Sequence, residues 1–170
     1  MIDSLEVQIG ELLRARKLKL ATAESCTGGL IASRITDIPG SSEYFLGGVS
    51  AYAYEAKVEM LNVSWDTLHI HGAVSRETVL EMARGMRNVL QADIALSVSG
   101  IAGPGGGLPD KPVGTTWFGL STPDGDWARV FCFSGNRLQN KSSSADAALQ
   151  LLMDYLNGSR NLDGDFRRRT

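Results

Sequence analysis

Cysteine and histidine are scarce in this sequence, which has two of each among 170 residues. The two cysteines, Cys26 and Cys132, form no Cys-x-x-Cys pair, and neither a signal peptide nor a long apolar run precedes them. This pattern speaks against a disulfide-stapled fold and against a cysteine-rich zinc site. We therefore expect free thiols in a cytoplasmic protein.

An excess of charge of one sign is also missing. The chain has 17 basic and 19 acidic residues, a net charge of −2 and a pI near 5.7. Such a balance gives no general attraction to nucleic acid or to an anionic membrane, so neither is an expected partner. The basic run Arg167–Arg169 is local, and we interpret residues 158–170 as a solvated, disordered tail.

Signals for a metal or a dinucleotide are weak. His69 and His71 stand two apart, but no cysteine or carboxylate accompanies them at ligand spacing, so we predict no metal site. The first expected strand is not followed by the Gly-x-Gly-x-x-Gly pattern, and Tyr52 and Lys57 are five residues apart rather than four. Both observations disfavour a Rossmann-type oxidoreductase.

The remaining composition is that of one ordinary globular domain, with 43% hydrophobic and 21% charged residues. A chain of this length buries about 70% of the surface that its unfolded form exposes, so it needs no metal or disulfide for stability. We find no internal repeat and no linker that would divide it. Residues 1–157 are therefore expected to form a single domain.

Hydrophobic periodicity predicts alternating helices and strands. The first helix would begin at a capping box of Asp3 and Glu6. The expected elements are a helix from about 5 to 13, a strand at 18–24, a helix at 27–37, a strand or strand end at 45–52, helices at 55–61 and 75–90, a strand at 93–99, a hairpin of 113–122 with 127–133, and a last helix over about 145–156. This order predicts a three-layer α/β/α sandwich on a mixed β-sheet.

The segment TAESCTGGL at 22–30 is the most informative functional signal. An apolar run stops at a Ser-Cys-Thr-Gly-Gly turn, and a helical pattern follows. Hydroxyl, thiol and free N–H groups would then gather at a helix N-terminus, where the partial positive charge favours anions and developing oxyanions. The segment predicts a catalytic or phosphate-binding site, although Ser25 and Thr27 could also be simple helix caps.

Two other segments would join this turn at the carboxyl ends of the strands, where α/β proteins bind ligands. Tyr52 and Lys57 belong to one of them, although each is also a common type of half-buried aromatic or solvated surface charge. The other is GIAGPGGG at 100–107. A loop with so many glycines suits a place where the backbone approaches a ligand, but could also be an unspecialised connection.

Taken together, six ordered blocks resemble one family. They are TAESCTGGL at 22–30, PGSS at 39–42, GGVSAYAYEAK at 47–57, GAVS at 72–75, GIAGPGGG at 100–107 and PVGT at 112–115. Their order resembles the C-terminal domain of the competence/damage-inducible protein CinA, the nicotinamide-nucleotide amidase family, over residues 4–157. The resemblance implies hydrolysis of nicotinamide mononucleotide to nicotinate mononucleotide and ammonia. It also implies a stand-alone form of this domain, no cofactor and a homo-oligomer, a dimer or larger.

Carried over by position, the resemblance makes Ser25 the nucleophile, with Tyr52 and Lys57 as its activating partners. A serine hydroxyl needs a base, and a lysine with a depressed pKa can serve where no histidine is linked to the motif. Backbone N–H groups of the turn would stabilise the oxyanion. The candidate substrate-binding residues are Cys26, Thr27, Gly28, Gly29, Ser42, Ser99, Gly100, Gly103 and Lys141.

The sequence departs from the family pattern in three places. Ala53 and Tyr54 follow the tyrosine where the family commonly has Ser-Asn, Ser99 replaces a threonine, and Lys141 aligns where an arginine is common, which loses bidentate phosphate recognition. These departures motivate a second hypothesis, a catalytically silent paralogue that binds a nucleotide as a sensor or partner module. Cys26 could be a redox-sensitive neighbour or an alternative nucleophile, but we favour a packing role.

Overall fold

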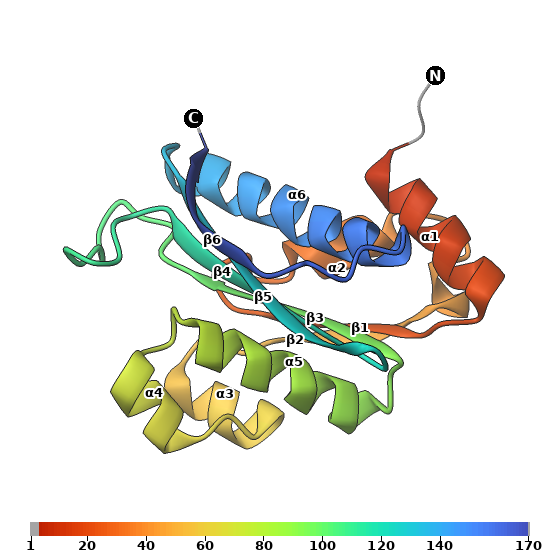
Figure 1. Cartoon of the computed structure of the whole chain (residues 1–170), viewed down its shortest axis with the longest axis horizontal. Helices are drawn as coiled ribbons and strands as arrows, with labels where there is room; N and C mark the ends of the chain where they lie inside the picture. Colours follow the sequence, from red (N-terminus) through yellow and green to blue (C-terminus); the bar gives the residue numbers. More distant parts are fainter. Residues whose placement is uncertain (1–3, 170) are drawn as a thin grey trace.

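A six-stranded mixed sheet with the strand order β2-β1-β3-β4-β5-β6 forms the middle of the molecule (Figure 1). The computed structural model describes residues 4–169, with side chains to residue 164. β1 is parallel to β2 and β3, β4 is antiparallel to β3 and β5, and β6 is parallel to β5. The strands are β1 (Leu20–Glu24), β2 (Phe45–Ser50), β3 (Ile94–Gly100), β4 (Thr115–Thr122), β5 (Gly125–Phe133) and β6 (Gly164–Arg169).

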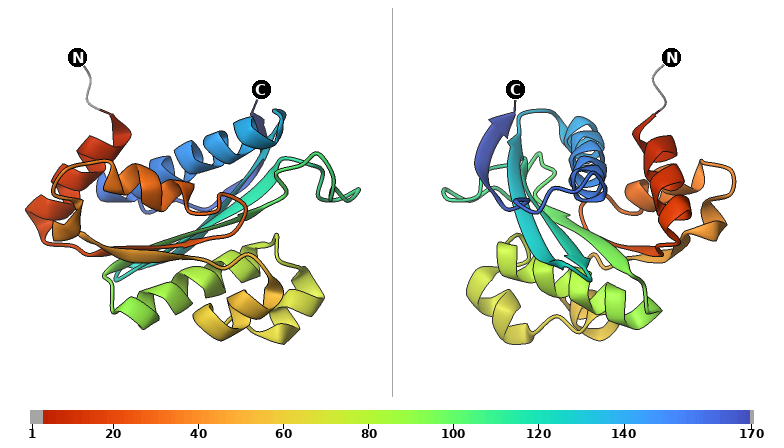
Figure 2. Two further views of the ribbon diagram at one scale, coloured as in Figure 1. Left: turned by 180° about the vertical axis from the view of Figure 1, so that it is seen from behind. Right: turned by 45° about the vertical axis from the view of Figure 1, so that its right-hand side comes forward.

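Helices cover both faces of this sheet (Figures 1 and 2). α1 (Leu5–Arg16), α2 (Leu30–Thr36) and α6 (Arg137–Leu156) lie on one face, and α3 (Tyr54–Leu61), α4 (Trp65–His71) and α5 (Arg76–Leu90) lie on the other. A short 3₁₀ helix, η1 (Ser41–Glu43), leads into β2. The arrangement confirms the predicted three-layer α/β/α sandwich.

The alternation of side chains along the inner strands explains the two apolar layers. In β3, Ile94, Leu96 and Val98 point into the core beneath α6, whereas Ala95 belongs to the core beneath α5. In β1, Leu20 joins the first core, and Ala21 and Ala23 join the second. The same alternation continues at the strand ends and determines the face of the sheet toward which each site residue points.

The start of the first helix differs from the prediction. Ser4 is the N-cap of α1, and its hydroxyl accepts a hydrogen bond from the Val7 N–H at 3.5 Å. Asp3, the predicted cap, lies outside the described residues. Glu6 accepts a hydrogen bond from Arg34 Nε at 2.6 Å, which links α1 to α2.

Residues 158–170 do not match the prediction of a disordered tail throughout. The stretch 164–169 forms β6, which pairs in parallel with β5 at the edge of the sheet. The prediction failed because edge strands are stabilised by main-chain hydrogen bonds to a neighbour that is distant in the sequence. Helix α4 was also not predicted, because its seven residues make too few helical turns to show a hydrophobic period.

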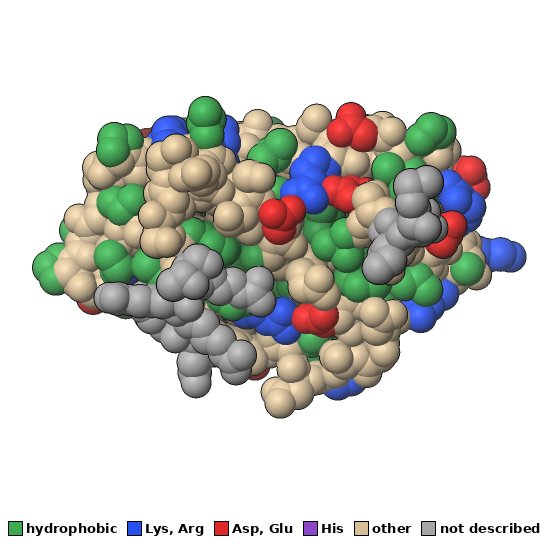
Figure 3. Space-filling model, turned by 90° about the horizontal axis from the view of Figure 1, so that it is seen from above, with side chains coloured by type: hydrophobic (Ala, Val, Ile, Leu, Met, Phe, Trp, Pro, Cys, Tyr) green, Lys and Arg blue, Asp and Glu red, His purple; other side chains and the backbone are tan. Residues whose placement is uncertain are grey.

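Acidic and basic side chains alternate on the face formed by α1, α2 and α6 (Figure 3). Arg34 illustrates this pattern, because its Nη1 donates to Asp146 on α6 at 2.6 Å while its Nε is bound to Glu6. On the described part of this face no large patch of one sign is visible. Each helix among the described residues is too short or too polar to cross a lipid bilayer.

The contact between α3 and α5 depends on Gly85. A Cβ added at this position would lie 1.8 Å from the Leu61 carbonyl oxygen. Alanine is favoured over glycine in a helix interior by about 1 kcal/mol. Here the clash dominates, and we expect Gly85→Ala to lower the free energy of unfolding by about 3 kcal/mol in denaturant titrations. Gly105→Ala, with no atom within 4 Å of its added Cβ, is the control; equal stabilities of the two variants would contradict this prediction.

Candidate active site

Three strands bring the candidate residues together at one edge of the sheet. β1, β2 and β3 are parallel, and Glu24 at the end of β1 stands opposite Ser50 of β2 and Val98 of β3. The chain leaves these strands through the turn at 25–29, the loop at 51–53 and the glycine-rich loop at 101–114. Parallel strands therefore place the three predicted segments at their shared carboxyl ends.

Ser25 and Lys57 form a direct buried pair. Lys57 Nζ lies 3.0 Å from Ser25 Oγ, and only 1% of the lysine is exposed. The amine also donates to the carbonyl oxygens of Ala51 at 2.8 Å and Tyr52 at 2.9 Å. A neutral amine has two N–H groups and one lone pair, so the two carbonyls can take both N–H groups and direct the lone pair at the serine.

Burial lowers the pKa of Lys57 from its ordinary value of 10.5 to about 8, because no water shell and no carboxylate stabilise the ammonium form. A smaller opposing influence comes from Cys26, which raises it. The pKa of the Cys26 thiol itself is raised to about 12, first by burial and then by the nearby charge of Glu24. A thiol with this pKa is a poor nucleophile at neutral pH. Cys26 also packs in the core beneath α6, in agreement with a packing role.

Tyr52 is adjacent to the pair, but its side chain is not part of it. The residue is 61% exposed, and its hydroxyl accepts a hydrogen bond from Arg137 Nη2 at 3.0 Å. Its backbone carbonyl, not its hydroxyl, contacts Lys57. The prediction that the phenol relays a proton is therefore not supported, since a phenol bound to Arg137 on α6 is directed toward solvent and away from the amine.

Glu24 is the main residue that sequence reasoning missed. This carboxylate is 1% exposed and accepts four hydrogen bonds, from Thr27 Oγ1 at 2.5 Å and from three backbone N–H groups at the start of α2. Those N–H groups belong to Gly29 at 3.1 Å, Ile31 at 3.1 Å and Ala32 at 2.9 Å. The available signal was an acidic residue at the end of an apolar strand, directly before a glycine-containing helix start.

This carboxylate changes the predicted role of the turn. The Gly29 N–H is bound to Glu24, and the Gly28 N–H donates to the Ser25 carbonyl at 3.1 Å. Of the turn's four N–H groups from Cys26 to Gly29, these two are thus already hydrogen-bonded within the protein. Among the described residues, no acceptor from another residue contacts the N–H groups of Cys26 and Thr27. These two groups remain available beside Ser25.

The glycine-rich loop flanks the same site. Ser25 N donates to Val98 O at 3.0 Å, so Ser25 continues β1 beside Ser99, and both lie on the α3–α5 side of the sheet. Gly100 packs so closely against Thr116 that a Cβ would lie 2.5 Å from its hydroxyl oxygen. Gly103 has a φ of +89° and presents its carbonyl to Arg137 Nη1 at 2.8 Å.

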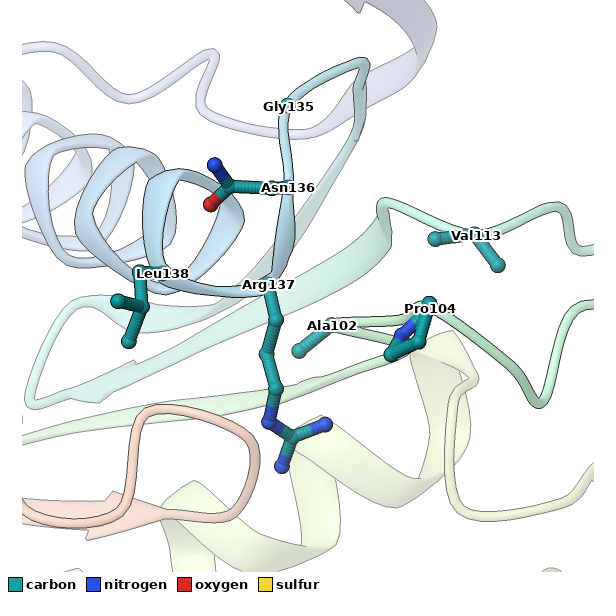
Figure 4. A pocket seen from close by; sticks show the side chains of 7 residues that line it. All are labelled: Ala102, Pro104, Val113, Gly135, Asn136, Arg137 and Leu138. Atoms are coloured by element: carbon teal, nitrogen blue, oxygen red, sulfur yellow. The ribbon is translucent and has the colours of Figure 1, made fainter.

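Beside this loop lies a pocket of about 400 Å³. Figure 4 shows Arg137 extending from the first turn of α6, with Ala102 and Pro104 of the loop beside it. Asn140, which is buried, donates to the Ala102 carbonyl at 3.1 Å and fixes the loop to α6. Neither Arg137 nor Asn140 could be predicted from the sequence motifs, because neither belongs to a recognised block.

Lys141 reaches the site, whereas Ser42 does not. The Lys141 ammonium lies 3.8 Å from the position that a Cβ on Gly28 would occupy, and no carboxylate among the described residues is paired with it. Ser42 lies in η1, before β2 begins, where the Tyr44 carbonyl meets the N–H of Leu20 at the start of β1. Within this chain the structure does not bring Ser42 to Ser25, because the length of the strand separates them.

The two histidines lie on α4 and contact groups other than the Ser25–Lys57 pair. His69 packs on Trp65 with ring centroids 5.5 Å apart, and His71 Nδ1 is 3.7 Å from Glu77. Between residues 4 and 169 no three His, Cys, Asp or Glu side chains gather in a way that could hold a metal ion.

The two residues that depart from the family pattern, Ala53 and Tyr54, make their contacts elsewhere than at the Ser25–Lys57 pair. Ala53 is the N-cap of α3 without a side-chain hydrogen bond, and Tyr54 turns toward the segment before α5, where its hydroxyl accepts from the Ala73 N–H at 3.2 Å. The larger ring therefore contacts the junction between α4 and α5 and does not contact the Ser25–Lys57 pair.

The fold and this site define an α/β/α protein with a buried serine–lysine pair at the carboxyl ends of its parallel strands. The chain belongs to the CinA C-terminal domain family, whose model matches residues 2–156. It is 51% identical over 159 residues to a CinA-like protein of Chloroherpeton thalassium, covering 91% of this chain and 38% of that protein. A putative competence-damage inducible protein of Halothermothrix orenii is 51% identical over 154 residues, with 90% and 37% covered. The chain thus spans a little over a third of the length of the curated relatives it matches.

Solved structures agree over almost their full length. The competence damage-inducible protein A of Klebsiella pneumoniae superposes with a TM-score of 0.88 at 35% identity, covering 92% of this chain and 97% of that one. A CinA superfamily protein of Escherichia coli gives a TM-score of 0.85 at 31% identity, with 91% and 93% covered. These similarities confirm the family and the fold.

Proposed function

We propose that this protein is an amidase that hydrolyses the carboxamide of nicotinamide mononucleotide. The observation that carries the proposal is the 3.0 Å contact between Ser25 Oγ and the buried amine of Lys57. A buried lysine with a lowered pKa is a known way to provide a base for a serine nucleophile. The substrate follows from the family resemblance, and Lys141, near Gly28, supplies a positive charge for its phosphate.

In the first half of the reaction, neutral Lys57 takes the proton of Ser25 as Oγ forms a bond to the amide carbon. The carbonyl oxygen becomes an oxyanion, which the N–H groups of Cys26 and Thr27 stabilise. The tetrahedral intermediate then breaks its C–N bond. The leaving nitrogen receives the proton from Lys57, and ammonia departs, leaving an ester on Ser25.

In the second half, Lys57 takes a proton from water as the water oxygen attacks the ester carbon. The bond to Ser25 Oγ breaks, and the serine regains its proton from Lys57. The products are ammonia and a carboxylic acid, whose proton passes to solvent or to the ammonia, and the enzyme returns to its starting state. The same resemblance supports our proposals of a cytoplasmic homo-oligomer that needs no cofactor.

The direct test is an assay of the purified protein for ammonia release from nicotinamide mononucleotide, with identification of the carboxylate product. Nicotinamide itself, which lacks the ribose and the phosphate, is the comparison substrate and is expected to react much more slowly. Saturable binding of the mononucleotide without ammonia release would contradict the proposal and support a nucleotide-binding module.

The pH dependence provides a second prediction. Lys57 acts as a base only in its neutral form, which is about a tenth of the molecules at pH 7 when the pKa is about 8. We expect kcat/KM to rise about tenfold per pH unit below pH 7 and to level off above pH 9. Steady-state rates between pH 6 and 10 measure this. A profile flat across this range would argue against Lys57 as the base.

A further inference from the structure

The Glu24 carboxylate forms no hydrogen bond with Ser25 Oγ or Lys57 Nζ, yet it accepts more hydrogen bonds than any other side chain of the site. Its Oε2 accepts from Thr27 Oγ1, Gly29 N and Ile31 N, and its Oε1 accepts from Ala32 N. No basic side chain within the described part of the chain forms an ion pair with it. A buried carboxylate held only by hydroxyl and amide donors is compensated by those donors, so their geometry is tightly fixed.

These contacts determine which N–H groups of the turn already have an acceptor. The turn that carries Ser25 bends through Gly28 and Gly29, whose φ values are +63° and +98°. Its beginning is fixed by Ser25 N, which donates to Val98 O at 3.0 Å, and its end is fixed by Gly29 N on the carboxylate. Thr27, midway along the turn, is held by its hydroxyl. The N–H groups of Cys26 and Thr27 lie between these fixed points.

Resting on the function proposed above, we infer that Glu24 is the positioning residue of the oxyanion site: it fixes the turn so that the Cys26 and Thr27 N–H groups point at the carbonyl oxygen of the substrate amide. The carboxylate occupies the N–H groups of α2 that would otherwise compete for that oxygen. Its role is exerted through the backbone, since its oxygens are directed at α2 and do not contact Ser25 Oγ or Lys57 Nζ.

The role can be tested with a fluorophosphonate, a probe that reads serine activation independently of the natural substrate. Ser25 Oγ would form a bond to phosphorus as fluoride leaves, with the serine proton passing to Lys57 and the phosphoryl oxygen in the oxyanion site. Labelling rates are compared for wild type, Glu24→Gln and the control Glu59→Gln, which changes an exposed carboxylate on the helix that carries Lys57.

We expect the Glu24→Gln variant to be labelled about 10²-fold more slowly than wild type. The NH2 group of glutamine would face backbone N–H donors of α2, and this repulsion would displace the turn. The apparent pKa of labelling, which reports Lys57, stays near its wild-type value, since the amine is held by other residues. In the amidase assay kcat falls by a similar factor while KM changes little. A loss caused by general unfolding would instead reduce the amount of labelled protein.

A second pair of variants keeps the test decisive where Glu24→Gln does not fold. Thr27→Ser retains the hydroxyl that reaches Glu24 and is expected to label at close to the wild-type rate, whereas Thr27→Val loses it and labels about tenfold more slowly. Folded Glu24→Gln that labels as fast as wild type overturns the inference, and so does equal labelling of the two Thr27 variants. If wild type itself is neither labelled nor active, the serine mechanism fails first.

Discussion

Ser25→Ala is expected to lower ammonia release from nicotinamide mononucleotide by about 10⁴- to 10⁶-fold. In the proposed mechanism the hydroxyl oxygen of Ser25 forms the bond to the amide carbon. The nearby Cys26 cannot replace it, because burial raises the pKa of the Cys26 thiol to about 12. Binding of the mononucleotide is expected to persist, since the turn and Lys141 are unchanged. Ammonia release and equilibrium binding measured on the same preparation separate the two effects.

Ser33→Ala is the matched control for this variant. Ser33 is exposed on α2, one helical turn beyond the site, so the same change there is expected to leave the rate unchanged. A Ser25→Ala protein that retains more than a tenth of wild-type activity would exclude Ser25 as the nucleophile. The reaction would then need direct attack by water.

Lys57→Met is expected to lower kcat/KM by about 10⁴-fold, the upper end of what a positioned general base contributes. Methionine approximates the length of the lysine stem but can neither take the serine proton nor return it to the leaving nitrogen. Ammonia release at pH 7 and pH 9 measures the effect. In contrast to wild type, the residual rate of the variant should no longer increase between these two values.

The same variant has a second signature in stability. The pKa of Lys57 is about 8 in the folded protein and near 10.5 when exposed, so the unfolded chain binds more protons between pH 8 and pH 10.5. The free energy of unfolding of wild type should therefore rise through this window, by about 3 kcal/mol in total, relative to Lys57→Met. Below pH 8 both states are protonated, and the difference between the two proteins is constant. Denaturant titrations at pH 7, 9 and 10.5 test this, and parallel curves would contradict the lowered pKa.

The proximity of Ser25 and Lys57 could be predicted from the sequence because strand order and chain direction constrain it strongly. Ser25 follows one buried strand and Lys57 follows the next, and the parallel pairing of β1 with β2 brings both exits to the same edge. The three layers could be predicted for a related reason, since each long helix shows a clear apolar period. α4 and β6 could not, because one is a short helix and the other depends on a distant neighbour.

Side-chain direction was harder to predict than position. Tyr52 was placed at the correct edge, but whether its ring or its carbonyl faces Lys57 depends on the loop conformation between Ser50 and Tyr54, which no sequence period encodes. Ser42 was assigned from its motif alone, although it precedes β2 and so lies at the amino end of that strand, whereas Ser25 follows β1 at the carboxyl end. Glu24 was quoted within a motif and still assigned no role, since three of its four partners are backbone N–H groups, which residue identity does not reveal.

The backbone and the side chain of Tyr52 make separate contacts, one with Lys57 and the other with Arg137. The carbonyl of Tyr52 contacts the amine, and every amino acid has that carbonyl, so the side chain at this position is released from maintaining the base. Its ring projects instead into solvent beside Arg137. A substitution at position 52 that keeps the main-chain conformation therefore leaves this contact with Lys57 in place.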